Sequence, residues 1–206
     1  MQYIKGLDAF DGRNHTAVTL GKFDGLHRGH QKLLNRIMKY AQKEDCDSVV
    51  CAFDMDRDCL MTNEERRAFL EDKVDYLIEI PFTREMMEME AEKFIDEILY
   101  KKLHASHIVV GTDFNFGHEK RGNHQMLEKY AAKYGYTVDV VEKAYYKDRE
   151  ISSTYIRELL LDGNVPLANE LLGYPYEITS VVEHGQQLGR TLGFPTMNLA
   201  PQGKKI

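Results

Sequence analysis

Cysteine is scarce in this 206-residue chain. The three cysteines, Cys46, Cys51 and Cys59, include no C-x-x-C pair. An odd number of cysteines without that spacing argues against a disulfide framework and against a zinc site. We therefore expect three reduced thiols, as in a cytoplasmic protein.

Long hydrophobic runs are also absent. No apolar stretch approaches the roughly 18 residues that a membrane-spanning helix needs, and the N-terminus lacks the basic and then apolar segments of a signal peptide. We therefore expect a cytoplasmic chain with no membrane partner.

Positive charge is not in excess, because 27 basic residues face 33 acidic ones, for a net charge of −6. A mildly acidic chain is a poor candidate for a general nucleic-acid binder. Internal repeats and low-complexity tracts are absent, and a hydrophobic share of 43% supports a packed core. We expect small-molecule partners, and nothing in the sequence indicates an oligomeric state.

Strand-like and helix-like patterns alternate along most of the chain. The expected strands are 17–20, 48–53, 76–80, 107–110 and 136–141, and the expected helices are 30–43, 63–73 (with Asn63 as N-cap), 89–103 and 123–134. This alternation predicts an α/β fold with a doubly wound, mostly parallel sheet. Ligands bind at the carboxyl ends of the strands in such sheets.

The chain changes character near residue 173. Ser152 or Ser153 can cap one helix, and Pro166 can open another that Gly173 ends. Residues 177–183 then form a pattern typical of a strand in an antiparallel unit. We expect a first domain over 1–173 and an incomplete β segment over 174–206, which is too short for its own core.

The most informative motif is the run G-K-F-D-G-L-H-R-G-H, residues 21–30, between a predicted strand and a predicted helix. His27 and His30 lie three residues apart at the expected helix start, so both can bind phosphate oxygens beside free backbone N–H groups. Gly29 removes a side chain that would block close approach. Nucleotidyl transfer needs such donors around the α-phosphate. The alternative is a surface turn with two solvated histidines.

A second motif, G-T-D-F-N-F-G over 111–117, follows another predicted strand. Phe114 and Phe116 could stack on a planar ring system, Asp113 could accept from a ring N–H, and Arg121 could face a phosphate. The alternative is an ordinary loop with both phenylalanine rings in the core.

A third motif, I-S-S-T-Y-I-R over 151–157, opens a predicted helix. Hydroxyls and free N–H groups at a helix N-terminus form an anion site, and Arg157 lies one turn further along. The alternative is simple capping by Ser152 or Ser153, which is compatible with anion binding.

These motifs resemble the HxGH nucleotidyltransferase superfamily, and the G-K-F-D-G form is closest to the FAD synthetase module of bacterial bifunctional riboflavin kinase/FAD synthetases. The resemblance covers about Val18 to Leu199, with four motifs in the expected order. It implies transfer of AMP from ATP to FMN, which gives FAD and pyrophosphate. Mg²⁺ would accompany ATP, held by phosphates and water rather than by a protein cage.

The resemblance also implies residue roles. His27 and His30 would be catalytic. The residues expected at the ATP site are Gly21, Phe23, Asp24, Gly29, Ser152, Ser153, Thr154 and Arg157. The residues expected at the flavin site are Asp113, Phe114, Phe116, Gly117 and Arg121.

The segment Gly189–Leu199 resembles the opening of the riboflavin kinase module. Thr196 and Asn198 match residues of that module's site for ATP and Mg²⁺. In the family, the acidic residue that activates the riboflavin hydroxyl comes later, and this sequence stops at Ile206. We therefore expect no riboflavin kinase activity from this chain.

The segment 53–60 departs from the family, which usually carries proline and histidine there. Its Asp54, Asp56 and Asp58 are typical of a solvated acidic loop rather than a metal cage. Two alternatives therefore stay open. One is a degenerate homologue that binds flavin or nucleotide without turnover, and the other is an HxGH nucleotidyltransferase for a different phosphate substrate.

Overall fold

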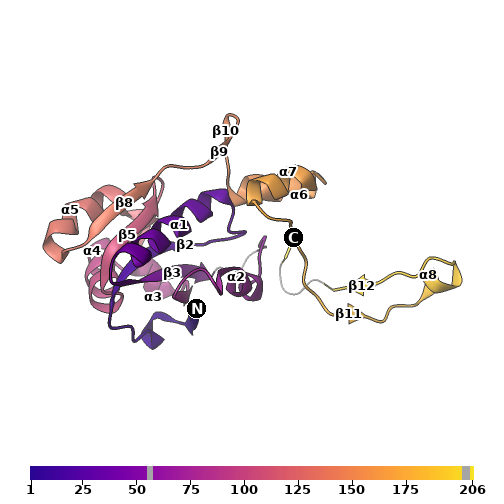
Figure 1. The fold of residues 1–206 in the computed structure, drawn as a ribbon, viewed down its shortest axis with the longest axis horizontal. Helices are drawn as coiled ribbons and strands as arrows, with labels where there is room; N and C mark the ends of the chain where they lie inside the picture. The colour runs from indigo at the N-terminus through magenta and orange to yellow at the C-terminus, as the bar shows by residue number, and fades with distance from the viewer. Residues whose placement is uncertain (55–57, 201–204) are drawn as a thin grey trace.

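A computed structural model describes residues 1–54, 58–200 and 205–206, and its centre is a six-stranded sheet (Figure 1). The strand order is β1-β4-β3-β2-β5-β8, and every pairing is parallel. The strands are β1 (Gln2–Lys5), β2 (His15–Gly21), β3 (Cys46–Asp54), β4 (Tyr76–Pro81), β5 (Ala105–Gly111) and β8 (Thr137–Val141). The predicted doubly wound α/β fold is confirmed, with β1 as a strand that the sequence analysis missed.

Helices connect and flank these strands. They are α1 (Arg28–Lys43), α2 (Asn63–Leu70), α3 (Arg84–Glu88), α4 (Ala91–Lys93), the π-helix η2 (Phe94–Lys102), α5 (His124–Tyr134), α6 (Ser153–Leu161), α7 (Val165–Leu172) and α8 (Leu188–Thr191), with short 3-10 turns η1 (Leu7–Ala9) and η3 (His118–Lys120). Some of these helices begin at capping residues, such as Asn123 before α5 and Ser152 before α6. Thr62, rather than the predicted Asn63, caps α2 through a capping box with Glu65. The helix predicted over 89–103 is instead divided into α4 and η2.

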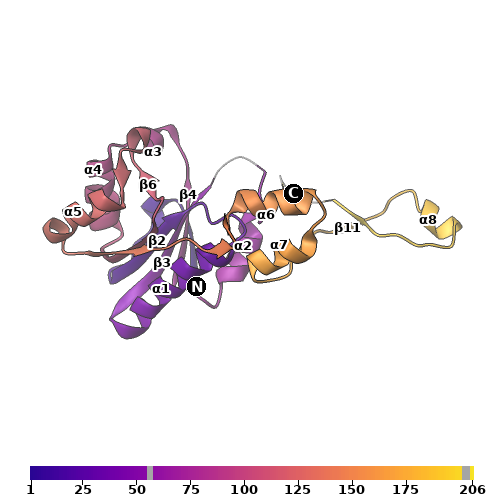
Figure 2. The same ribbon diagram turned by 90° about the horizontal axis from the view of Figure 1, so that it is seen from above.

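Different helices cover the two faces of the sheet (Figure 2). Leu34 and Ile37 of α1 pack in one buried cluster with alternate side chains of β3 and β4. Leu99 of η2 and Leu127 of α5 pack in a second cluster on the opposite face. Both clusters are buried, so the sheet is a central layer between two layers of helices.

The connections place a switch point beside β2. The chain passes from β2 through α1 to β3 on one side, and after β4 it returns to β5 on the other side. Gly21 and Gly111, the last residues of β2 and β5, therefore flank the position where an open α/β sheet binds ligands.

The chain beyond β8 forms a small helical layer and a projecting tail. A hairpin of β9 (Tyr145–Tyr146) and β10 (Arg149–Glu150) leads to α6 and α7, which share an apolar cluster that includes Leu60. The tail pairs β11 (Val182–Glu183) with β12 (Asn198–Leu199) in antiparallel fashion, so the strand predicted over 177–183 forms only at its end. A third two-stranded unit joins β6 (Asn115–Phe116) to β7 (Gly122–Asn123).

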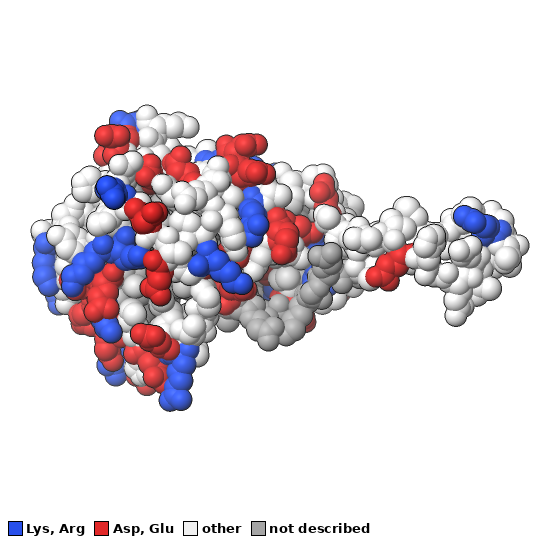
Figure 3. Space-filling model, turned by 90° about the horizontal axis from the view of Figure 1, so that it is seen from below, with Lys and Arg blue, Asp and Glu red and all other residues white. Residues whose placement is uncertain are grey.

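The surfaces of the body and the tail differ. Figure 3 shows acidic and basic side chains interspersed on one face of the body and a largely uncharged tail that projects from it. Large apolar side chains of the tail, such as Leu192 and Phe194, are exposed. In the described part of the chain, no helix is both long and apolar enough to cross a membrane.

Candidate active site

The turn between β2 and α1 has an unusual backbone. Phe23, Gly25 and Leu26 have φ angles of 48°, 77° and 34°. The side chains of Phe23 and Leu26 are fully buried, and their packing holds these angles in place. Glycine suits position 25, because other residues rarely adopt a φ of 77°, and a Cβ there would also lie 2.9 Å from Leu60 Cδ1.

The turn leaves several backbone N–H groups without an acceptor. Among the described residues, the N–H groups from Phe23 to His30 donate to no backbone or side-chain acceptor. His27 occupies the N-cap position of the 16-residue helix α1, and its side chain makes no capping bond. Unpaired N–H groups and the positive end of a helix dipole together favour an anion.

The two histidines face each other at this helix start. Their rings stack with centroids 3.8 Å apart, and the Nδ1 atoms of both are buried without a partner among the described residues. Burial lowers the pKa of His27 to about 4. Burial, His27 and the Arg66 guanidinium lower the pKa of His30 well below its usual value. Both rings are therefore neutral near pH 7, and the interpretation as two solvated histidines is wrong.

The start of α6 lies against the same turn. Ser153 Oγ donates to the Asp24 carbonyl over 2.8 Å, and Ser152 Oγ caps α6 by accepting from Tyr155 N–H over 3.2 Å. A Cβ on Gly29 would lie 3.6 Å from the Ile151 carbonyl and 3.1 Å from the His27 ring. The structure therefore brings two of the three predicted motifs, with two helix N-termini, to one edge of the sheet.

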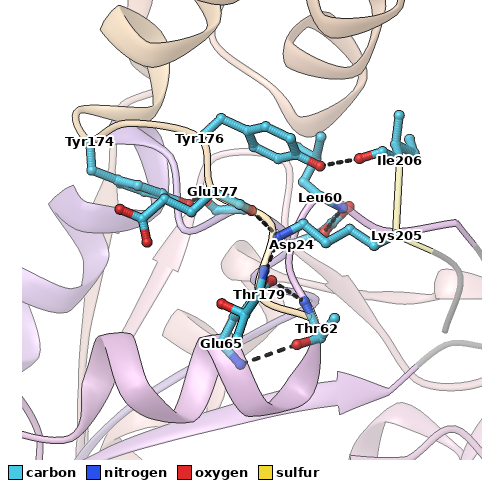
Figure 4. Close-up of polar contacts among 11 residues, drawn as sticks. Asp24, Leu60, Thr62, Glu65, Tyr174, Tyr176, Glu177, Thr179, Lys205 and Ile206 are labelled. Carbon is cyan, nitrogen blue, oxygen red and sulfur yellow. Dashed lines mark hydrogen bonds and ion pairs between the residues drawn. The ribbon is translucent and has the colours of Figure 1, made fainter. Parts of the chain in front are cut away.

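Arg157 is engaged differently from the expectation. Its guanidinium pairs with Asp24 Oδ2 over 2.7 Å. Asp24 Oδ1 accepts from the Leu60 N–H over 2.7 Å (Figure 4). Both oxygens of the buried Asp24 carboxylate are thus occupied. In this structure Asp24 and Arg157 brace the turn through Nη2 of the guanidinium.

Gly21 and Phe23, both expected at the ATP site, differ in what the structure shows of them. A Cβ on Gly21 would meet only the Phe23 ring, at an ordinary 3.4 Å. The fold therefore does not require glycine at position 21. The buried Phe23 ring packs edge-on against His30 at 5.2 Å, so it supports the histidine and is closed to a ligand.

The two phenylalanines of the second motif divide between core and surface. Phe116 is buried against Phe94, with ring centroids 5.3 Å apart. Phe114 is half-buried and stacks on Phe116 at 5.6 Å, so it keeps an accessible side. Gly117 has a φ of 73°, and a Cβ there would lie 2.7 Å from Ala91 Cα. Packing against α4 thus explains Gly117 without a ligand.

Ion pairs occupy the charged residues of this loop. Asp113 pairs with Lys143 over 3.1 Å, and Lys143 also pairs with Glu150 over 2.8 Å, next to the start of the third motif. Arg121 is exposed and pairs with Glu119 over 3.2 Å. Sequence reasoning missed Lys143, because a lone lysine after a strand carries no signal of its position.

The tail and the acidic segment hold the remaining predicted residues. Thr196 and Asn198 are exposed and line a cavity of about 180 Å³ in the tail, which projects away from the His27 turn (Figures 1 and 2). Residues 55–57, including Asp56, lie outside the described part of the chain. Within that part, no three or more His, Cys, Asp or Glu side chains form a group that could hold a metal ion.

Comparison with known proteins agrees with this geometry. Residues 10–155 match the FAD synthetase family, and residues 172–206 match the riboflavin kinase family. The chain belongs to the FAD synthetase family. The part matched to that family contains the turn after β2, the loop after β5 and the first residues of α6. The strand β1 lies before it.

Similar proteins include bacterial bifunctional riboflavin kinase/FMN adenylyltransferases. The protein from Buchnera aphidicola subsp. Schizaphis graminum is 35% identical over 97% of this chain and 68% of its own length. The Haemophilus influenzae protein is 36% identical over 97% and 68%, and the Escherichia coli K12 protein is 35% identical over 88% and 62%. A solved Streptococcus pneumoniae structure, named a macrolide-efflux protein, is 31% identical, with a TM-score of 0.88 over 100% of this chain and 70% of that one.

Proposed function

We propose that this member of the FAD synthetase family is an FMN adenylyltransferase. The observation that carries the proposal is the pair of stacked, neutral histidines at the start of α1, each with an unpartnered Nδ1, beside the free N–H groups of α6. This arrangement supplies uncharged donors for a polyphosphate at the switch point of the sheet.

In the proposed reaction, an FMN phosphate oxygen attacks the α-phosphorus of ATP. A bond forms between that oxygen and phosphorus, the bond to the β-phosphate bridging oxygen breaks, and pyrophosphate leaves. No covalent enzyme intermediate is needed, so the protein acts by positioning the substrates and stabilising charge. ATP would enter with Mg²⁺ held by its phosphates and by water, as is usual for this ion at nucleotide sites.

His27 and His30 would donate to the phosphate oxygens as negative charge gathers on them. Approach of the phosphates raises the pKa of each ring, because an opposite charge favours the protonated imidazole. The N–H groups of residues 152–154 at the start of α6 would bind the pyrophosphate portion, together with the Ser152 and Thr154 hydroxyls. The Ser153 hydroxyl would join them on leaving the Asp24 carbonyl, to which it donates here.

FMN would bind beside the loop that follows β5. Phe114 offers the accessible aromatic surface, and Asp113 lies on the same loop near the end of β5. Residues 1–173 would form the adenylyltransferase domain, and 174–206 a segment related to riboflavin kinases. We assign no riboflavin kinase activity to this chain, since only residues 172–206 match that family.

The test compares FAD formation from FMN and ATP in the wild type and in His30→Ala. Loss of one such donor lowers kcat by about 10²–10³-fold. His15→Ala is the matched control, because His15 is exposed at the opposite end of β2. A His30→Ala enzyme with wild-type kcat would refute the assigned role.

A substrate panel tests the reaction class. FMN should be adenylylated, whereas phosphopantetheine and nicotinamide mononucleotide should not. Tight binding of FMN and ATP without pyrophosphate release would instead identify a binding protein without turnover.

A further inference from the structure

A buried ionic network lies behind the turn that joins β2 to α1. Arg66, on α2, has a side chain only 6% exposed, and its Nη1 donates to the Lys22 carbonyl over 2.9 Å. Its Nη2 lies 3.4 Å from Oε1 of the equally buried Glu79 on β4. Glu79 in turn accepts from the Tyr3 hydroxyl over 2.6 Å, which extends the network to β1.

The bond to Lys22 fixes the orientation of a peptide group in the turn. The peptide bonds described here are all trans, so the Lys22 carbonyl and the Phe23 N–H point in opposite directions. Anchoring the carbonyl on Arg66 thereby aims the first of the unpaired N–H groups away from α2. The same peptide precedes the strained φ of 48° at Phe23.

The guanidinium also acts on His30 through its charge. The titratable groups that face His30 are His27, on its own element, and Arg66, on α2. Arg66 Nε is buried without a partner among the described residues, as is Nδ1 of His30. The positive charge of Arg66 opposes protonation of the ring and adds to the larger effects of burial and His27 on its pKa. Glu79 balances that charge through its ion pair with Arg66.

We propose that Arg66 is a positioning residue of the adenylyl-transfer site, which fixes the Lys22–Phe23 peptide and adds its positive charge to the surroundings of His30. The proposal rests on the adenylyltransferase function proposed above. Arg66 itself is buried beneath the turn, so it would act through the Lys22–Phe23 peptide and not by binding a substrate. The run E-E-R-R in a helix is typical of a solvated helix face, so the sequence alone does not indicate that Arg66 is buried.

Two variants separate the steric effect from the electrostatic one. Arg66→Lys keeps the charge and loses the forked geometry, so kcat/KM for FAD formation should fall by about 10²-fold from misplacement of the turn. The double variant Arg66→Gln/Glu79→Gln removes both charges without leaving an unpaired one. In the pH profile of this variant, the fall of kcat/KM on the acid side should move to higher pH, because loss of a neighbouring cation raises the pKa of His30.

The control is Arg67→Gln on the same helix. The Arg67 guanidinium stacks over the Tyr3 ring, 3.5 Å from its centroid, so it contacts the far end of the network rather than the Lys22 carbonyl. This variant should keep the wild-type kcat/KM and pH profile. Thermal melting of all variants shows whether each is folded at the assay temperature.

A second readout does not depend on turnover. NMR titration of the His30 Cε1–H signal in the substrate-free protein should show a higher pKa in the double variant than in wild type and Arg67→Gln. An unchanged His30 titration and unchanged pH profile would overturn the electrostatic part, and a wild-type kcat/KM in folded Arg66→Lys would overturn the steric part. If the wild type forms no FAD, the adenylyltransferase proposal fails, whereas the titration still reports on Arg66.

Discussion

At the scale of single residues, burial sets the chemistry of His27 and His30. A solvated histidine is partly charged near neutral pH, whereas these two rings are held neutral with one nitrogen unpaired. Such a nitrogen is costly to bury without a partner. The site therefore gains a ready binding position for phosphate oxygens at the expense of stability in the free protein.

The neutral state of His27 has a consequence for acid stability. Its pKa is about 4 when folded and about 6.5 when unfolded, so the unfolded state binds the proton first as the pH falls. Stability contributed by the neutral ring is present above pH 6.5 and is lost toward pH 4, with about 2 kcal/mol gone at about pH 4.5.

Urea unfolding of the wild type and His27→Asn at neutral pH and at about pH 4.5 checks this. The wild type should lose more free energy of unfolding between the two conditions than the variant does. Equal losses in both proteins would show that His27 is not buried in its neutral form.

Two glycines of the same turn should respond differently to alanine. Gly25→Ala should lower the free energy of unfolding by about 1–2 kcal/mol, since φ is 77° and the added methyl group meets Leu60. Gly21→Ala should leave stability nearly unchanged, yet raise the KM for ATP if the ligand approaches this backbone. Chemical denaturation paired with steady-state kinetics distinguishes the two, and equal destabilisation would contradict the assignment of Gly21 to the ligand.

At the scale of elements, the turn after β2 is held by helices far along the chain. Gln31 Nε2 donates to the carbonyls of Leu26 and Leu172 over 2.9 and 2.7 Å, and the Tyr174 hydroxyl donates to the Gly25 carbonyl over 2.6 Å. The end of α7 thus fixes the turn, just as the start of α6 does. Segments 120 or more residues away preorganise the phosphate site.

Removal of one such hydroxyl tests this coupling. Tyr174→Phe should lower the free energy of unfolding by about 1 kcal/mol and raise the KM for ATP, because the Gly25 carbonyl loses its donor. Tyr145→Phe is the control, since that ring is largely exposed on β9. If the two variants have the same KM for ATP, the end of α7 does not act on the site.

Much of the element order could be predicted from the sequence, because strands such as β3 are continuous apolar runs and α7 has Pro166 and Gly173 at its ends. The strand β1 could not, since its four residues are stabilised by pairing with β4. The motifs located the histidine turn and α6. They could not reveal that Asp24 engages Arg157, or that Arg66 is buried, because both depend on tertiary contacts.

At the scale of the whole molecule, a packed body carries a weakly attached tail. The tail returns to the body through Lys205 and Ile206, where Lys205 pairs with Glu65 and the Ile206 N–H donates to the Cys59 carbonyl over 3.1 Å (Figure 4). The residues between, from Val181 to Ala200, are almost all exposed. Few contacts therefore protect this stretch from local opening.

Limited trypsin digestion should cut the tail first. Arg190 is exposed and is the only lysine or arginine between Arg157 and Lys204. Mass spectrometry should find an early fragment that ends at Arg190, with FAD formation retained after this cut. Initial cleavage within the sheet layers, or loss of activity at the same rate as cleavage after Arg190, would contradict the division into body and tail.

The stoichiometry of the reaction tests directly whether this chain transfers AMP to FMN. The purified chain is incubated with FMN, ATP and Mg²⁺, and FAD and pyrophosphate are quantified, with riboflavin in place of FMN as a parallel reaction. An FMN adenylyltransferase should give equal amounts of FAD and pyrophosphate from FMN and no flavin product from riboflavin. Bound FMN and ATP without FAD, or a phosphorylated product from riboflavin, would contradict this prediction.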